Sequence, residues 1–359
     1  MANPEPNNIL GAAHAPLMCV PLDALQHDSR PTGLSSGPPA VNRISAVTAT
    51  PLAAAAATAS PSPALLERLT PEQRAFILRA WERLLSHLRA VVFDLHGPDW
   101  TPLAIEQLGD VLCDFADVFS KSKTDFGSCS LMPFEISVPE GSPPVTSRPH
   151  RINTILAKEI DATLNRYLAA GLIQHSTSPC SSPLVVIPKK SGGVRITLNY
   201  KKLNKISGLI QLPIPRMDQV LDSLGKGRMF SLFDLVSSFH QITAHKDTFP
   251  LTAFCTPADL YVWFVMPHGS SASPGRFVKV INEVIKGLEP MAAYLDDVIV
   301  FESDPTAHVR TMRALFERLC KHNPKLSPSK ARLGATDADS LGHSISPAGV
   351  RPNAEKYPR

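Results

Sequence analysis

The sequence predicts an α+β fold, in which helices and short strands alternate irregularly around an antiparallel centre. Two observations support this class. Apolar residues recur at helical spacing in several segments, for example in residues 153–170. Elsewhere, short β-branched runs lie on both sides of polar turns, which is typical of antiparallel hairpins. With 359 residues, 43% of them hydrophobic, the chain can form one large domain or two ordinary ones.

The N-terminal part combines a segment without periodicity and a well-marked helix start. Residues 1–63 are rich in Ala, Pro, Ser and Thr, which predicts disorder. Thr70 then precedes Pro71, and Gln73 completes a capping box with Thr70 as the N-cap. We expect this helix to extend to about Val91.

The other elements follow from the same local signals. Leu156, Ile160, Leu164 and Leu168 form a stripe at i+4 spacing, and Gly171 suits the end of their helix. Further elements are expected as helices over residues 103–119, 216–224, 273–287 and 306–322, a linker over 138–149, strands over about 184–188, 194–200 and 229–235, and a hairpin over about 340–351.

The segment Tyr294-Leu295-Asp296-Asp297 is the strongest functional signal. Apolar runs on both sides predict a hairpin with Asp296 and Asp297 at its tip. Two adjacent carboxylates repel each other unless a cation lies between them, and Mg²⁺ prefers such oxygen ligands. The alternative is an ordinary solvated turn, because Asp tolerates turn geometry.

Asp234 favours a metal site over an ordinary solvated turn. It lies inside the apolar run 229–235, where a lone carboxylate is costly unless it is paired or bound to metal. Three carboxylates on adjacent strand ends can hold two metal ions and catalyse in-line phosphoryl or nucleotidyl transfer.

At this point the chain resembles the reverse transcriptases of gypsy-like LTR retrotransposons. The Tyr-Leu-Asp-Asp box and the run Phe230–Gln241 around Asp234 are characteristic, and the similarity covers about residues 105–356. Besides these two, the matching blocks are residues 176–190, 193–204, 212–216, 265–269, 325–330, 341–346 and 349–352.

The resemblance implies a right-hand polymerase with an antiparallel palm sheet and a largely missing thumb. The implied partition is a disordered segment 1–63, a helical region and linker 64–150, fingers 151–228, palm 229–323, and a primer-grip hairpin with a truncated thumb edge 324–359. It also implies RNA-directed DNA polymerisation on an RNA or DNA template with a primer, with deoxynucleoside triphosphates as substrates and two Mg²⁺ or Mn²⁺ ions as cofactors. Asp234 and Asp296 would be the principal metal ligands and catalytic residues, and Asp297 a third, weaker one.

Four further residues would contact the nucleotide by resemblance. Lys190 and Arg195 match phosphate-contacting positions, although the sequence leaves the choice between Lys189 and Lys190 open. Phe239 matches the aromatic residue that blocks a ribose 2′-hydroxyl; its alternative is a core Phe. His268 stands where related enzymes carry Gln or Phe.

Four other residues would contact the primer or template. Tyr294 flanks the aspartates, and its alternative role is packing in a strand. Leu341, Gly342 and His343 resemble the primer-grip hairpin, where Gly342 would let backbones approach closely. A solvated hairpin residue is the alternative for His343.

The charge distribution and the cysteines indicate which partner and which cellular compartment suit this protein. Residues 1–150 carry 10 Lys and Arg against 15 Asp and Glu, whereas residues 151–359 carry 26 against 17. The basic half contains the carboxylate motifs, which suits a polyanionic partner, although many of these cations simply solvate helices. The six cysteines form no Cys-x-x-Cys pair, and neither a signal peptide nor a membrane-spanning run is evident. We expect an intracellular protein, in a cytoplasmic particle or the nucleus, without a membrane partner.

Two alternative interpretations assign the chain to other classes of protein, without catalytic activity. Departures from the family, such as Asn199, Arg276, Pro324 and Ser340, favour a degenerate fragment that binds nucleic acid without turnover. The N-terminal helices alone would also suit an interaction protein.

Overall fold

The computed structural model describes residues 60–95, 99–188, 193–208, 217–225, 227–340, 343–347 and 349–352. All of them belong to one compact unit, residues 53–359. The disorder expected for residues 1–63 falls almost wholly outside this part, although helix α1 (Pro63–Arg68) already begins at its last residue.

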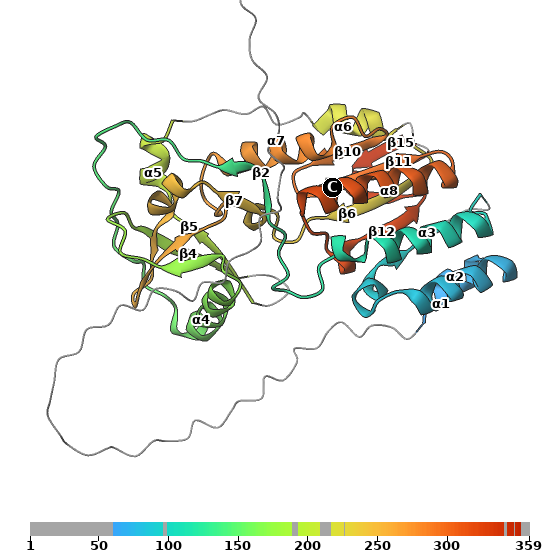
Figure 1. Ribbon diagram of the computed structural model, residues 1–359, viewed down its shortest axis with the longest axis horizontal. Helices are drawn as coiled ribbons and strands as arrows, with labels where there is room; N and C mark the ends of the chain where they lie inside the picture. The colour runs from blue at the N-terminus through green and yellow to red at the C-terminus, as the bar shows by residue number, and fades with distance from the viewer. Residues whose placement is uncertain are drawn as a thin grey trace, which may run out of the picture. The chain divides into compact units, whose positions relative to one another are not determined.

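The functional segments meet in one five-stranded sheet, which we call the aspartate sheet (Figure 1). It runs in the order β1 (Val92–Phe93), β12 (Arg332–Ala335), β6 (Met229–Asp234), β11 (Asp297–Glu302) and β10 (Met291–Tyr294). The four strands from β12 to β10 pair antiparallel, as expected for the centre of the fold, whereas β1 pairs parallel with β12.

Alternate side chains of this sheet pack into two different cores. Val298 and Val300 of β11 join the larger core, and Ile299 and Phe301 join a smaller one. Such alternation is the expected consequence of the period-two geometry of a strand.

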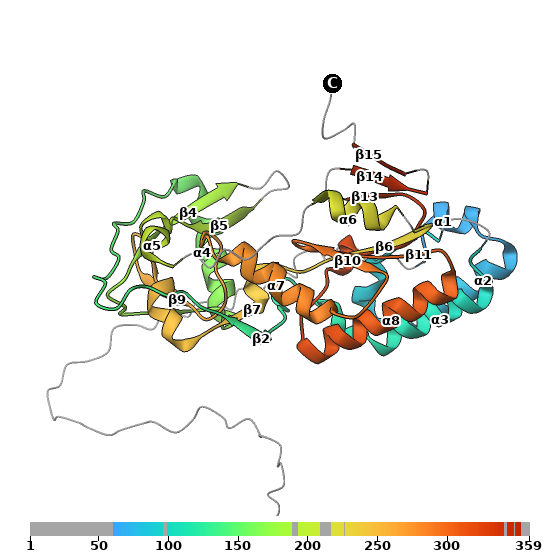
Figure 2. The same cartoon turned by 90° about the horizontal axis from the view of Figure 1, so that it is seen from above.

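Helices cover both faces of the aspartate sheet (Figure 2). The larger core contains residues of α7 (Ser273–Ile285) and α8 (Pro305–His322), and the smaller core contains residues of α6 (Met217–Leu224) and Ile345. Ile345 belongs to a three-stranded sheet of β13 (Ala338–Ser340), β14 (His343–Ser346) and β15 (Gly349–Pro352). Its last two strands form the hairpin expected near residues 340–351.

The N-terminal helix starts as predicted but ends early. In α2 (Pro71–Arg83) both hydrogen bonds of the capping box between Thr70 and Gln73 are present. The helix stops at Arg83, not near Val91, because Leu84 is extended and turns its buried side chain into the core. A 3-10 helix, Ser86–Ala90, follows and leads into β1.

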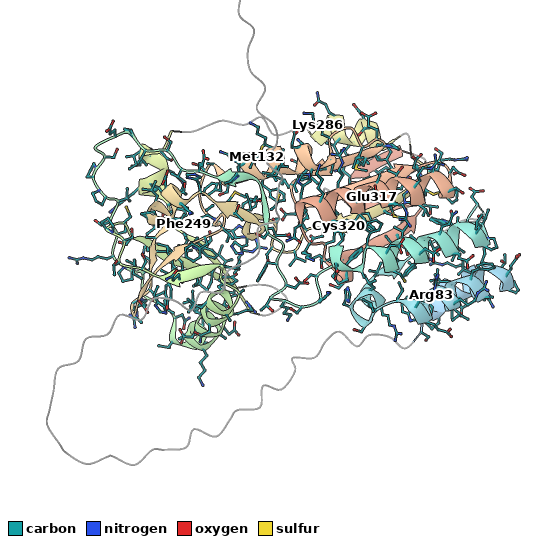
Figure 3. All side chains as sticks on the ribbon, in the orientation of Figure 1. Arg83, Met132, Phe249, Lys286, Glu317 and Cys320 are labelled. Atoms are coloured by element: carbon teal, nitrogen blue, oxygen red, sulfur yellow. The ribbon has the colours of Figure 1, made fainter. Side chains whose placement is uncertain are left out.

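Helix α3 (Pro102–Asp114) is likewise shorter than the expected 103–119, and a 3-10 helix, Ala116–Val118, completes that range. It packs between α2 and α8. Arg83, labelled in Figure 3, donates to Asp110 at 2.7 Å, and Arg313 of α8 donates to Asp114 at 2.7 Å. The helical region therefore shares its core with the aspartate sheet.

A second five-stranded sheet, the β4–β5 sheet, carries the other basic segment. Its order is β3 (Ile173–His175), β9 (Leu260–Trp263), β8 (Phe254–Cys255), β4 (Ser182–Pro188) and β5 (Val194–Leu198). Helix α4 (Thr154–Ala169) carries the predicted stripe, and α5 (Lys201–Ile206) follows β5. Strands β8 and β9 join this sheet although they lie in the range expected for the palm.

Residues 138–149 contain no helix or strand, as expected for a linker. Just before them, β2 (Cys129–Phe134) pairs parallel with β7 (Ile242–Ala244), a pairing that the sequence did not predict. Within the described ranges, no helix has both the length and the apolar character that crossing a membrane requires.

Acid should destabilise the fold through His308. This residue of α8 is fully buried, its Nε2 lies 2.7 Å from Ser231 Oγ, and burial lowers the pKa of His308 to about 4. An unfolded chain binds a proton near the ordinary value of 6.5, so stability is complete above that pH and falls as pH drops toward 4. The loss from this group should be about 3 kcal/mol.

Urea unfolding midpoints measured across this pH range test the prediction, with His308→Gln as the comparison. The variant should show a flatter pH profile than the wild type, because glutamine does not titrate. Parallel profiles would contradict the assignment to His308.

Candidate active site

Strand register brings the predicted aspartates together. Asp234 ends β6 and is the direct cross-strand partner of Asp297, the first residue of β11. Asp296 precedes it in the two-residue turn between β10 and β11, and its carbonyl accepts from the Leu235 N–H at 3.0 Å. Directly opposed residues on neighbouring antiparallel strands face the same side of a sheet. The sequence prediction that Asp296 and Asp297 lie at a hairpin tip, next to Asp234, agrees with this geometry.

The turn itself is under backbone strain. Leu295 has φ +50°, a left-handed conformation in which a branched side chain is disfavoured. Two-residue hairpin turns of this kind usually place glycine at that position. Strain of this type costs roughly 1–3 kcal/mol and tends to occur at functional sites.

Lys330 neutralises the central aspartate. Its Nζ lies 2.9 Å from Oδ1 and 2.8 Å from Oδ2 of Asp234. Burial raises the pKa of Asp234, the hydrogen bond and charge of Lys330 lower it, and the negative charge of Asp296 raises it again. The opposing effects show that Asp234 lies within electrostatic reach of both neighbours.

The donor set fits a divalent cation. Asp234 and Asp297 are opposed carboxylates, which repel without a cation, and carboxylate oxygen is the ligand type that Mg²⁺ prefers. In the described part of the chain no three His, Cys, Asp or Glu side chains are gathered as a metal-binding group. A cation already engages Asp234 here, in the form of the Lys330 ammonium.

Phe239 lies in a short 3-10 helix, Ser238–Gln241, that follows β6. Its ring packs against the ring of His268 at a centroid distance of 4.8 Å and against Phe277 of α7 at 5.5 Å. Both predicted roles, core packing and contact with a sugar, remain compatible with this half-buried position.

His268 links the two sheets electrostatically. Burial is the main cause that lowers its pKa, the positive charge of Arg195 on β5 lowers it further, and Asp296 raises it. The next residue, Gly269, has φ +107°, and a Cβ there would lie 2.2 Å from the Leu198 carbonyl oxygen. Glycine at this position therefore lets the His268 loop approach β5.

The primer-side residues are only partly within the described structure. Tyr294 packs against the smaller core, which supports its packing role. His343 pairs with Ser340 and Pro352 in the three-stranded sheet. Lys189, Lys190, Leu341 and Gly342 lie outside the described residues.

Sequence reasoning assigned no role to two residues of the site, Lys330 and His240. Lys330 is the last residue of the matching block 325–330, so that motif could point to it, but only folding brings it to Asp234. His240 stacks on Trp263 at a ring-centroid distance of 4.7 Å, and neither of its ring nitrogens has a hydrogen-bond partner among the described residues. Burial lowers the pKa of His240 well below its usual range, which makes it a neutral core residue.

An antiparallel sheet that ends in aspartates and is backed by helices agrees with the polymerase class of fold. Comparisons with known proteins show which polymerases this chain is similar to. Residues 187–345 match the family described as "Reverse transcriptase (RNA-dependent DNA polymerase)". Residues 187–345 are therefore similar to a reverse transcriptase domain, and the chain is similar to retrotransposon Pol polyproteins.

The relatives are much longer than this chain. It is 34% identical over 220 residues to the Retrovirus-related Pol polyprotein from transposon 297 of Drosophila melanogaster, which covers 59% of this chain and 21% of the relative. The corresponding polyprotein from transposon 412 is 27% identical over 280 residues, or 76% and 23% of the two chains. The chain thus spans about a fifth to a quarter of these curated relatives.

Solved structures support the same fold. The foamy viral protease-reverse transcriptase in complex with double-stranded DNA aligns with a TM-score of 0.68 and 22% identity, covering 82% of this chain and 50% of the other. The same viral protein with an RNA/DNA hybrid aligns with a TM-score of 0.66 and 22% identity, covering 80% and 37%. At this identity the likeness establishes the fold alone.

Proposed function

We propose that this chain catalyses RNA-directed DNA synthesis, adding deoxynucleotides to a primer paired with a template. The observation that carries the proposal is the register that sets Asp234 opposite Asp297, with Asp296 in the adjoining turn. The reverse transcriptase match over residues 187–345 includes all three aspartates.

The aspartates would hold the cofactor. Two Mg²⁺ or Mn²⁺ ions, when bound, would activate the primer 3′-hydroxyl and stabilise the leaving pyrophosphate. Asp234 and Asp296 would be the main ligands, and Asp297 would be a third, weaker one. The protein's own part is to place the three carboxylates and to bring their charge next to the substrate phosphates.

The nucleotide would lie against Phe239, His268 and Arg195. This grouping is supported by how close the three residues lie to one another. The ring centroids of Phe239 and His268 are 4.8 Å apart, and the charge of Arg195 acts on His268. Arg195 is exposed on β5, where its guanidinium can grip phosphate oxygens bidentately. Lys190 would supply a second positive charge.

The nucleic-acid partner would be a primed RNA or DNA template. The viral structures that share the fold hold double-stranded DNA or an RNA/DNA hybrid. Tyr294, Leu341, Gly342 and His343 would contact the primer end, and the excess of positive charge in residues 151–359 favours a polyanion. The five cysteines of the described part are free, which suits a reducing intracellular compartment.

A primer-extension assay tests the proposal. Purified protein receives a primed RNA template, deoxynucleotides and either Mg²⁺ or Mn²⁺, and the products are resolved by length. We expect extension by the wild type and by Asp247→Asn, an exposed Asp whose side chain lies near His245, but not by Asp296→Asn. Equal extension by Asp296→Asn would refute the proposal. Salt-sensitive template binding without extension would instead indicate a nucleic-acid-binding domain that has lost turnover.

A further inference from the structure

Lys330 gives one aspartate of the site an internal cation. Its ammonium contacts both carboxylate oxygens of Asp234, at 2.9 Å and 2.8 Å. A divalent ion bound at Asp234 would need these same oxygens. The carboxylate therefore has two alternative partners of the same charge sign, one within the chain and one from solution.

The main chain around Lys330 is tied to the end of β6. The Ser327 N–H donates to the Asp234 carbonyl at 2.8 Å, and the Val236 N–H donates to the Lys325 carbonyl at 3.0 Å. Gln241 adds a bridge, because its Oε1 accepts from the Lys325 N–H at 2.6 Å and its Nε2 donates to the Lys325 carbonyl at 3.0 Å. These bonds keep the lysine beside Asp234 whatever its side chain does.

The side chain itself is free to leave. It is 62% exposed, whereas that of Asp234 is 20% exposed. Rotation of the lysine stem into solvent would uncover the carboxylate without any change in the backbone. This combination of a fixed main chain and an exposed, flexible side chain suits an exchangeable partner better than a permanent one.

We propose that Lys330 is a resident counter-ion of Asp234 that competes with the divalent metal ion. This inference rests on the proposed function. In the metal-free protein the ammonium offsets the charge of Asp234 next to Asp296. Metal entry exchanges one cation for another, so Lys330 raises the metal concentration that the site needs. Lysine–carboxylate pairs of this exposure should change a metal dissociation constant by about two- to fivefold.

Mn²⁺ binding to the full chain, measured by electron paramagnetic resonance at fixed pH without nucleic acid, tests the proposal. Lys330→Met and Lys330→Gln, two neutral variants, should lower the Kd for Mn²⁺ about two- to fivefold. Lys330→Arg keeps the charge and should remain near the wild type. Thermal unfolding midpoints identify the variants that are folded.

Lys286 provides a matched control. Its Nζ contacts both oxygens of Glu283, at 3.2 Å and 3.4 Å, in an exposed pair at the end of α7 (Lys286 is labelled in Figure 3). Lys286→Met removes the same charge and should leave the Kd unchanged.

Two outcomes separate this proposal from the proposed function. If Asp234→Asn abolishes Mn²⁺ binding but neither neutral Lys330 variant tightens it, the competition is refuted and the metal site stands. If Asp234→Asn leaves Mn²⁺ binding unchanged, or the wild type binds none, both the metal site and the competition are refuted.

Discussion

Replacing Asp234 by asparagine should lower the rate of primer extension by roughly a thousandfold, equivalent to about 4 kcal/mol of lost transition-state stabilisation. Asparagine keeps the size of the side chain but removes the charge that a metal ion needs. Asp297→Asn should cost less, roughly tenfold, if Asp297 is the weaker ligand. Single-turnover extension with saturating template and nucleotide measures both effects.

Template binding provides the control for this prediction. Asp234→Asn should bind a primed template as well as the wild type at equal salt, because a catalytic carboxylate adds no attraction for phosphates in the absence of metal. A variant that extends primers within tenfold of the wild-type rate would show that Asp234 does not carry the chemistry.

Truncation of Trp100 should destabilise the protein by about 3–5 kcal/mol, in the range for large buried aromatic residues. Trp100 is fully buried, and its carbonyl accepts from Gln73 Nε2 at 2.6 Å. Gly334 of β12 has φ +68°, and a Cβ there would lie 2.5 Å from the Trp100 ring, so ring and strand are in close contact. Trp100→Ala would leave a cavity beneath the strand that follows Lys330. Chemical denaturation monitored by circular dichroism gives the free energy of unfolding.

Leu103→Ala is the matched control, because Leu103 is a 60% exposed neighbour in α3. It should change the free energy of unfolding by no more than about 0.5 kcal/mol. If Trp100→Ala were equally mild, Trp100 would not be part of the same cooperative core as the aspartate sheet.

The candidate site was accessible to sequence reasoning because its signals are local. A two-residue turn between β-branched runs defines the Asp296 hairpin, and an acidic residue that ends an apolar run singles out Asp234. The capping box at Thr70 was equally readable, since both of its hydrogen bonds form within one turn. Phe239 and His268 could be named only through the resemblance, because an aromatic residue near a strand has no local pattern that separates packing from function.

Contacts between distant segments could not be read in the same way. The end of α2 at Arg83 depends on a core that pulls Leu84 inward, and helical propensity alone would continue the helix. The parallel pairing of β1 with β12 joins residues 92 and 332, and no local pattern specifies a partner so far along the chain. The same holds for β2 and β7.

The sequence by itself determined the local elements, the aspartate turn and the family resemblance, because these depend on residue type and spacing along a few turns or strands. Only the tertiary structure decided that the N-terminal helices share the core of the aspartate sheet, that Arg195 and His268 come within electrostatic reach, and that Lys330 engages Asp234. These contacts depend on long-range packing and strand register, whose free energy arises from burial and charge pairing between segments that lie far apart in the chain.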